Sequence, residues 1–435
     1  MSKKKILMLG WEFPPIINGG LGVACLGLAK AMREHFDLSI VLPKSDPNFV
    51  VDQVELIGLN NLSIKEIKEF HSYSESYSIF EDVSIFETNI LPYNDVEKVD
   101  VLTSTTSNVH KKVDVHTNRL ENDLNAFKFG DLYGEDVIEK VKQYSHYVLQ
   151  LAENKEFDII WAHDWMTYLA GVELKKKFNK PLVVHVHATT YDRGGVDARG
   201  WVYDIEKYGM EQADCIIPVS NYTGDICVSH FGAEPSKIYP VHNGVEYVEA
   251  YREEKKFPEA LVLFLGRITG QKGPEIFLEI ADKVIHQYKK VRFVMAGTGD
   301  QLKGIIESGA YRHIGDKFHF TGFLNKEKVN RLLAMADVYC MPSVSEPFGL
   351  SALEAAQFGI PVILSKQSGA AEVMAGALKT DFWDVDLTSK LIVDLVSNPK
   401  YAASVRDAGY EDLKLLTWEN ASEKIATKFH QLING

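Results

Sequence analysis

The feature that most constrains the fold is an alternation between apolar runs of strand length and longer amphipathic segments. In the C-terminal half, helical candidates such as Pro274 to Tyr288 and Lys326 to Met335 separate these runs. The expected strands there are Leu261 to Leu265, Arg292 to Ala296, Phe318 to Thr321, Val338 to Met341 and Pro361 to Leu364. Because the runs are continuously apolar, both faces of each strand should be buried, as in a parallel sheet covered by helices. The pattern predicts a doubly wound α/β domain.

The N-terminal half repeats this pattern. Its expected strands are Ile6 to Leu9, Leu38 to Val41, Ile159 to Ala162, Leu182 to His187, Cys215 to Val219 and Ile238 to Val241. The stretch from about Ser45 to Glu135 breaks the rhythm with runs such as Val83 to Phe86 and a polar tract, Thr103 to Asn108, and no strand is assigned there. A chain of 435 residues exceeds one ordinary core, so two such domains are expected.

The best linker combines Asn243-Gly244 with the charged segment Tyr251 to Pro258. We therefore expect an N-terminal domain at residues 1–245 and a C-terminal domain at residues 246–416, with a cleft between them as the default ligand site.

Charge and cysteine usage narrow the classes of partner. The formal net charge of −13 argues against binding to nucleic acid or to anionic membranes, so an anionic ligand must be held by local cations. The four cysteines lack metal-site spacing and lie among apolar residues, which favours buried free thiols and a reducing cytoplasm. No apolar segment reaches the ~18 to 20 residues needed to span a bilayer.

Asn18-Gly19-Gly20-Leu21-Gly22 precedes an expected helix with an apolar stripe at Leu21, Cys25, Leu28 and Met32. Glycine amides at a helix N-terminus form an anion-binding site. A plain glycine turn is the alternative. NAD binding is disfavoured because the glycines do not follow the strand directly and no acidic residue ends the next strand.

Cations follow one strand of the C-terminal half. Gly266-Arg267 closes the run Leu261 to Leu265, and Lys272-Gly273 opens the next helix. Two cations at the carboxyl end of a strand suit a diphosphate, although a solvated charge pair is the simpler alternative. Gly297-Thr298-Gly299-Asp300 follows another strand and could bring backbone close to a nucleotide, but such turns are common.

The run Ser345 to Glu354 follows the strand Val338 to Met341 and enters a helix through Pro347 and Gly349. Glu346 should lie in the loop above the sheet, with free amides near Gly349 and Leu350. Glu354, two turns further on, lies on a largely apolar helix where a carboxylate needs a partner. The alternatives are a helix N-terminal charge for Glu346 and a solvated face for Glu354.

His163-Asp164 ends the strand Ile159 to Ala162, and His185 and His187 end the next one. A histidine satisfied in the core is the commoner role, yet positions at adjacent strand ends favour a site. No histidine or acid spacing typical of a metal site occurs, and no GxSxG motif is present.

Together these segments resemble the GT-B glycosyltransferases, specifically glycosyltransferase family 4 with its glycogen and starch synthases. The matching motifs, in the family's order, are Gly19 to Gly22, His163-Asp164-Trp165, His242 to Val245, Gly266-Arg267 with Lys272-Gly273, Gly297 to Gly299, and Glu346 to Glu354. The resemblance implies two Rossmann-like domains, with residues 417–435 crossing back to pack on the N-terminal domain.

The resemblance also implies residue roles. Arg267, Lys272 and glycine amides would hold the donor diphosphate, Glu346 would bind hydroxyls of the transferred sugar, and His163 would approach its carbon-six hydroxyl. Glu354 would take the ribose hydroxyls. The implied catalytic residues are His163, Arg267, Lys272 and Glu346, and the implied donor-binding residues are Gly19, Gly20, Gly297, Thr298, Thr321, Phe323, Phe348, Gly349, Leu350 and Glu354.

The expected activity is metal-independent, retaining transfer of glucose from ADP-glucose or UDP-glucose to an oligosaccharide or polysaccharide such as glycogen. A lipid or small-molecule acceptor is one alternative, and a non-catalytic nucleotide-sugar-binding protein is another. Asn18 replaces the lysine usual in bacterial synthases, and His187 to Arg193 departs from their usual His-Asn segment. Donor base, acceptor and oligomeric state stay open.

Overall fold

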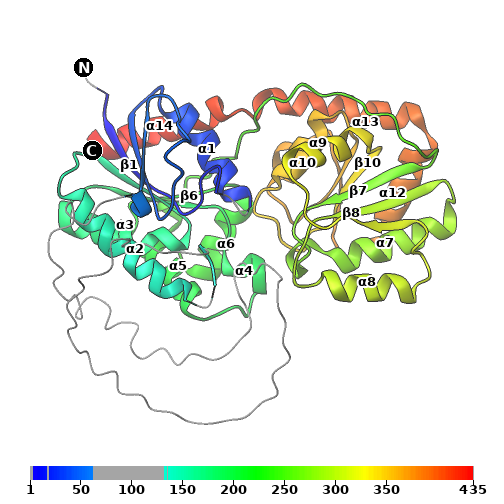
Figure 1. Ribbon diagram of the computed structural model, residues 1–435, viewed down its shortest axis with the longest axis horizontal. Coiled ribbons are helices and arrows are strands. Elements are labelled where there is room, and N and C mark those ends of the chain that lie inside the picture. The colour runs from blue at the N-terminus through cyan, green and yellow to red at the C-terminus, as the bar shows by residue number, and fades with distance from the viewer. Residues whose placement is uncertain (1–2, 17–18, 62–131, 135, 435) are drawn as a thin grey trace, which may run out of the picture.

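The computed structural model describes residues 3–16, 19–61, 132–134 and 136–434. They form two α/β domains, each built on a six-stranded sheet in which every strand pair is parallel (Figure 1). The predicted fold class, two doubly wound Rossmann-like domains, is confirmed. Asn18, Val83 to Phe86 and Thr103 to Asn108 lie outside the described residues.

The N-terminal sheet has the strand order β3-β2-β1-β4-β5-β6. Its strands are β1 (Lys5–Leu9), β2 (Asp37–Leu42), β3 (Val54–Gly58), β4 (Ile159–His163), β5 (Leu182–Val186) and β6 (Cys215–Pro218). Its helices are α1 (Gly20–Met32), α2 (Val137–Ala152), α3 (Trp165–Phe178), α4 (Thr190–Gly194), α5 (Trp201–Gln212) and α6 (Asn221–Phe231), with short 3-10 turns at Leu59–Asn61 and Pro235–Lys237. The order reverses between β1 and β4, which is where ligands bind in such sheets.

The C-terminal sheet has the equivalent order, β12-β11-β10-β7-β8-β9, and reverses between β7 and β10. Its strands are β7 (Ala260–Leu265), β8 (Val291–Ala296), β9 (Phe318–Phe320), β10 (Val338–Met341), β11 (Val362–Ser365) and β12 (Leu378–Thr380). Its helices are α7 (Pro274–Gln287), α8 (Leu302–Tyr311), α9 (Lys326–Met335), α10 (Leu350–Gln357), α11 (Ala370–Val373), α12 (Val385–Ser397) and α13 (Pro399–Asp412), with 3-10 turns at Gly270–Lys272 and Leu413–Leu415.

Successive residues of the central strands point to opposite faces of each sheet, and both faces are covered. In β4, the Trp161 ring packs edge-on against Phe429, with ring centroids 5.3 Å apart, whereas Ala162 lies under Gly171 of α3. In β7, Leu261 belongs to one apolar cluster and Val262 to the other. This two-sided burial explains the continuously apolar strands in the sequence.

The last helix, α14 (Trp418–Asn434), returns to the N-terminal domain and packs beside α1 (Figure 1). Its buried residues, among them Trp418 and Phe429, belong to the apolar core of that domain. A Cβ atom added at Gly27 of α1 would overlap the Trp418 ring, so the two helices approach closely because Gly27 lacks a side chain. Within the described ranges, no helix combines the length and apolarity that a membrane crossing requires.

The structure differs from the predicted elements at three places. Ile238 to Val241 is not a strand: Ile238 forms an isolated bridge with Ile216 of β6, and Tyr239 N and Val241 N donate to β6 carbonyl oxygens, without a continuous ladder. The edge strands β3 and β12 were not predicted. β3 is partly exposed and β12 has three residues, so neither gives the apolar run that marks a central strand.

Candidate functional site

Two helix starts meet where the domains face each other. α1 begins at Gly20, after Gly19, and α10 begins at Leu350, after Gly349. A Cβ atom at Gly20 would lie 3.8 Å from Leu350 Cδ1, so the two starts are in contact across the domain boundary. Each helix start offers backbone N–H groups without intrahelical partners and the positive end of a helix dipole. The structure therefore joins two of the predicted anion-binding segments into one place.

The cationic segment after β7 is shaped by glycines. Gly273 has φ +67, and a Cβ atom there would overlap the Pro342 carbonyl oxygen, so a larger residue would push β7 and β10 apart. This turn sets Lys272 at the carboxyl end of the sheet, where its ammonium pairs with the Glu346 carboxylate. Arg267 follows β7 and is half-buried.

Glu346 is buried in the loop between β10 and α10, at 5% exposure. Its N–H donates to the Gln367 carbonyl oxygen at 2.9 Å, and its own carbonyl oxygen accepts from Gly369 N at 3.0 Å. These bonds fix the backbone on which the carboxylate stands. Lys272 compensates the charge of that carboxylate, as a buried charge requires.

The helix that follows carries the second carboxylate. Glu354 is half-buried on α10 and pairs with Lys326 Nζ at 2.6 Å. Gly349 has φ +106, and a Cβ atom there would lie 2.9 Å from Met341 Cε, so this entry to α10 needs glycine. Phe348 is buried, and its ring packs 6.1 Å from the His242 ring.

The turns after β7, β8 and β9 lie side by side. Gly297 N donates to the Gly322 carbonyl oxygen at 3.1 Å, and Ile268 N donates to the Thr298 carbonyl oxygen at 2.8 Å. A Cβ atom at Gly297 would overlap the Gly266 carbonyl oxygen. Thr298, Thr321 and Phe323 are exposed. The predicted nucleotide-binding turns thus share one edge with the two cations.

His163 lies at the end of β4, directly opposite His185 of β5 in the sheet register. It is fully buried, its Nδ1 lies 2.9 Å from His187 Nε2, and Cys25 Sγ lies 3.6 Å from the same Nδ1. The three imidazole rings stack, with centroids 4.4 to 5.2 Å apart. Burial lowers the pKa of His163 well below its usual value and that of His187 to about 3, so both rings are neutral.

Asp164 has an unusual backbone conformation, with φ +58 and ψ 169, a region that non-glycine residues rarely enter. Its carboxylate accepts hydrogen bonds from His187 N at 2.7 Å and Ala188 N at 3.4 Å. Burial raises the pKa of Asp164 to about 7 against the lowering effect of these bonds. The residue ties the end of β4 to the segment that follows β5.

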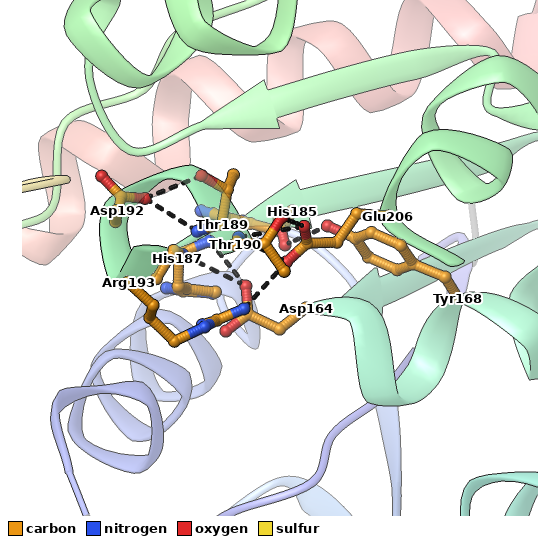
Figure 2. Close-up of polar contacts among 10 residues, drawn as sticks. Asp164, Tyr168, His185, His187, Thr189, Thr190, Asp192, Arg193 and Glu206 are labelled. Atoms are coloured by element: carbon orange, nitrogen blue, oxygen red, sulfur yellow. Dashed lines mark hydrogen bonds and ion pairs between the residues drawn. The ribbon is translucent and has the colours of Figure 1, made fainter. Parts of the chain in front are cut away.

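Glu206 of α5 holds the same segment from the other side (Figure 2). It accepts from Thr190 N at 3.0 Å, from Thr190 Oγ1 at 2.7 Å and from Arg193 Nη2 at 3.0 Å. Burial raises its pKa to about 7, opposed by Arg193 and the Thr190 donors. The segment from His187 to Arg193 is therefore fixed by carboxylates at both ends.

That segment also reaches the other domain. Asp192 forms a capping box with Thr189 at the start of α4, and its other oxygen accepts from Ser345 Oγ at 2.6 Å. Because the single Ser345 proton goes to Asp192, Tyr222, whose hydroxyl lies 3.0 Å from Ser345 Oγ, must be the donor there. Ser345 precedes Glu346, so the N-terminal domain contacts the loop between β10 and α10 directly.

A second set of bonds crosses the boundary beside the first. Ser220 Oγ donates to the Pro347 carbonyl oxygen at 2.6 Å. Glu372 of α11 accepts from Asn221 N at 3.0 Å, Tyr222 N at 2.6 Å and His242 Nε2 at 2.7 Å. The carboxylate thereby binds the N-terminus of α6, where free amides and the helix dipole favour an anion. The domains are thus held together on both sides of Glu346.

Several of these residues were not singled out by the sequence. Asp192, Ser345, Tyr222 and Glu372 act across the domain boundary, and no local motif marks them. Cys25 is buried and free, as are the other three cysteines, yet its sulfur, His163 Nδ1 and His187 Nε2 lie within 4.8 Å of one another. For the histidines, the sequence offered one signal that their rings lie together. His185 and His187 are two residues apart, and this spacing places both rings on the face that carries His163.

Comparison with known proteins agrees with this arrangement. A family model described as starch synthase catalytic domain matches residues 5–237, and one described as glycosyl transferases group 1 matches residues 248–412. The glycogen synthase of Mycobacterium tuberculosis is 24% identical over 383 residues, which cover 85% of this chain and 80% of that protein.

Solved structures have the same fold. Sucrose-phosphate synthase from Thermosynechococcus elongatus superposes with a TM-score of 0.71 at 17% identity, covering 99% of this chain and 100% of that one. The Anabaena protein HepE in complex with UDP-glucose gives a TM-score of 0.65 at 15% identity, covering 98% and 99%. Because the starch synthase model spans more than half of the 435 residues, the chain belongs to the starch synthase catalytic-domain family, and it is a glycosyltransferase of the GT-B fold.

Proposed function

We propose that the protein is a retaining transferase of glycosyltransferase family 4 that moves glucose from ADP-glucose or UDP-glucose to an α-glucan such as glycogen. The observation that carries the proposal is the contact between the starts of α1 and α10, at Gly20 and Leu350, beside the Lys272–Glu346 ion pair. Amides at helix starts and a cation bind a diphosphate, and a carboxylate accepts hydrogen bonds from sugar hydroxyls. The proposal therefore rests on one place that offers both donors for a diphosphate and an acceptor for sugar hydroxyls.

In this proposal the diphosphate is held by amides at Gly19, Gly20, Gly349 and Leu350 and by the side chains of Arg267 and Lys272. When the bond between the sugar C1 and the diphosphate oxygen breaks, negative charge accumulates on the diphosphate. The preorganised cations and helix starts stabilise that charge. They do the work that a divalent cation does in metal-dependent transferases, so no metal is required.

Donor binding would exchange two ion pairs for ligand contacts. Lys272 would move from Glu346 to the diphosphate, and Glu346 would accept hydroxyls of the transferred sugar. Glu354 would exchange Lys326 for the ribose hydroxyls, with the base near Thr298, Thr321 and Phe323. His163, neutral and buried, would donate a hydrogen bond toward the carbon-six hydroxyl of the sugar.

Retention follows if the acceptor attacks from the face that the diphosphate leaves. The departing phosphate oxygen takes the proton of the acceptor hydroxyl while the acceptor oxygen bonds to C1, so both events share one face and the anomeric configuration is kept. Four buried free thiols suit a reducing compartment, and we place this activity in the cytoplasm.

Calorimetry of the full chain with ADP-glucose and UDP-glucose, followed by incubation with glycogen, tests the proposal. We expect one of the two donors to bind and the glycogen to gain glucose in α-linkage. Tight NAD binding without nucleotide-sugar binding would overturn the proposal.

A small-molecule or lipid acceptor is the second candidate, because the segment His187 to Arg193 departs from that of the glycogen synthases and is rigidly held by Asp164 and Glu206. Donor hydrolysis without glycogen elongation would favour it. Donor binding with neither transfer nor hydrolysis would instead indicate a nucleotide-sugar-binding protein.

A further inference from the structure

A thiol and two imidazoles from three separate elements converge behind the helix starts. Cys25 comes from the second turn of α1, His163 from the end of β4, and His187 from the residue after β5. Their sulfur and nitrogen atoms all lie within 4.8 Å of one another. No local spacing in the sequence links them.

The distances are close to those of a tetrahedral metal site. A Zn²⁺ ion with a Zn–S bond of about 2.3 Å and Zn–N bonds of about 2.0–2.1 Å separates sulfur from nitrogen by about 3.6 Å and two nitrogens by about 3.4 Å. Cys25 Sγ and His163 Nδ1 are already 3.6 Å apart. The two imidazole nitrogens, at 2.9 Å, need to separate by about 0.5 Å to reach the zinc geometry.

The chemistry around the cluster also suits a cation. Sulfur and imidazole nitrogen are the ligands of tetrahedral Zn²⁺ sites. The side chain of Asp164 lies beside the cluster, where its Oδ1 accepts a hydrogen bond from His187 N at 2.7 Å. A carboxylate in that position attracts a cation.

The polar atoms around the cluster lack protein partners. His163 Nε2 and both ring nitrogens of His185 are buried, and none of the three has a hydrogen-bond partner. Buried polar atoms are normally satisfied, so three unsatisfied imidazole nitrogens in one stack show that the protein alone does not complete the polar contacts of this region. Within the set Cys25, His163 and His187, only His187 is not fully buried.

From this geometry we propose that Cys25, His163 and His187 bind one thiophilic divalent cation of the Zn²⁺ type and that the bound ion inhibits glycosyl transfer. Sulfur and imidazole ligands select Zn²⁺ over Mg²⁺, Mn²⁺ and Ca²⁺. Binding deprotonates Cys25 and releases one proton, and the imidazole that donates in the bond between His163 Nδ1 and His187 Nε2 moves its ring proton to its other nitrogen. The inhibition rests on the proposed function, since an ion on His163 would take the place of the sugar hydroxyl; the binding does not.

Cobalt substitution of the full chain tests the binding. Tetrahedral Co²⁺ gives visible ligand-field bands, and a thiolate ligand adds a charge-transfer band in the near ultraviolet. We expect both bands to saturate at one equivalent of Co²⁺, with Zn²⁺ displacing the Co²⁺. Cys25→Ala should lose the charge-transfer band and weaken Zn²⁺ binding by at least about 100-fold, as measured against a chromophoric chelator.

Cys340→Ala is the matched control, because Cys340 is also buried and free but lies in the core of the other domain. It should keep both bands. If Cys25→Ala does not fold, His187→Gln gives the same comparison, with weaker Zn²⁺ binding expected. A Co²⁺ spectrum without a thiolate band, or equal Zn²⁺ affinity in the variants and the unaltered chain, would show that the imidazoles are only hydrogen-bonded to each other and overturn the proposal.

The inhibition is tested separately. Zn²⁺ should reduce transfer by the unaltered chain at concentrations that fill the site, whereas Mg²⁺ at the same concentration should not. Full activity with the site filled would refute the inhibition. A chain that binds Zn²⁺ at Cys25 but transfers no sugar under any condition would refute the proposed function and leave the metal site standing.

Discussion

The two sheets have the same strand order, but the residues at their carboxyl edges differ. At the ends of β4 and β5 lie His163, Asp164 and the segment tied to Glu206, in which the carboxylates of Asp164, Asp192 and Glu206 are buried. After β7, β8 and β9 lie glycine turns with half-buried cations, Arg267 and Lys272. The shared topology places a possible site at the carboxyl edge of each sheet. The residues that follow each strand determine the character of that edge: buried and hydrogen-bonded in the N-terminal domain, partly exposed and cationic in the C-terminal domain.

This difference assigns unequal roles to the two domains. In the proposed function the C-terminal edge exchanges its ion pairs for the donor, since its cations, Arg267 and Lys272, are partly exposed. Rearranging the N-terminal edge would cost free energy, because breaking its buried charged network leaves charged side chains without partners. We therefore expect substitutions of the C-terminal cations to change ligand binding and transfer, and substitutions in the buried charge network of Asp164, Arg193 and Glu206 to change stability.

The largest effect is expected at the C-terminal edge. Lys272→Ala should lower kcat/KM for nucleotide-sugar transfer by about 10²- to 10³-fold, because one preorganised donor to the departing charge is lost. Calorimetry with UDP and ADP should show the same loss of diphosphate affinity. Lys283→Ala, an exposed lysine of α7 paired with Asp386, is the control and should leave transfer unchanged. Wild-type transfer by Lys272→Ala would remove the proposed role.

Arg193 tests the opposite edge. Arg193→Ala should lower the free energy of unfolding by about 3 kcal/mol, because Glu206 is left buried without its cation. Urea unfolding followed by circular dichroism measures this effect, and donor affinity of the folded fraction should stay unchanged. Equal stability of Arg193→Ala and the unaltered chain would mean that the two edges do not differ in rigidity.

The two domains also differ in the packing of their cores, because the last helix, α14, contributes apolar residues to the core of the N-terminal domain. Gly27→Ala should destabilise the protein by about 1–3 kcal/mol, because the added Cβ atom would overlap the Trp418 ring. Gly304→Ala in α8 is the matched control: a Cβ atom there meets nothing within 4 Å, and alanine is the better helix former, so stability should rise by up to about 1 kcal/mol. Equal effects of the two substitutions would contradict close packing of α1 on α14.

The sequence predicted the central strands of both sheets because burial on two faces leaves an unbroken apolar run. β3 and β12 leave no such run, because β3 is partly exposed and β12 has three residues. The apparent strand Ile238 to Val241 forms an isolated bridge to β6 instead of a ladder. The positions of Arg267 and Lys272 at the carboxyl edge of the C-terminal sheet were predictable, because both residues follow β7. The contacts of Cys25 with His163 and of Asp192 with Ser345 were not, because they join residues 138 and 153 positions apart and depend on tertiary packing.

The bonds across the domain boundary should affect turnover more than donor affinity. Asp192→Asn weakens the charge-assisted bond from Ser345 Oγ, and Ser345→Ala removes it; we expect either change to lower kcat by about tenfold, or about 1.4 kcal/mol. The loop of Glu346 would then be held less firmly, while the cations that bind the diphosphate stay in place. Steady-state kinetics of both single variants and the double variant measure the coupling, and additive losses would show that the two residues act independently.

The smallest effect concerns Glu372, which binds the start of α6 from the other domain. Burial alone would raise the pKa of Glu372. Hydrogen bonds from His242, Tyr222 and Asn221 lower the pKa by more than burial raises it, so the pKa lies below the ordinary value of 4.5. A carboxylate with a lowered pKa in the folded state adds stability above its ordinary pKa and loses it as the pH falls through the lowered value. Glu372→Gln should therefore shift the urea midpoint slightly at pH 7, and the difference from the unaltered chain should shrink as the pH falls below 4.5.

The control for Glu372 is Glu279→Gln, an exposed residue of α7, for which no such pH-dependent difference is expected. A midpoint difference that persists unchanged at low pH would mean that the Glu372 charge does not hold the domains together. The boundary would then depend on the bond from Ser220 to the Pro347 carbonyl oxygen and on the bond from Ser345 to Asp192. Of these two bonds, the second has a titratable partner, so any remaining dependence of domain opening on pH would be assigned to Asp192.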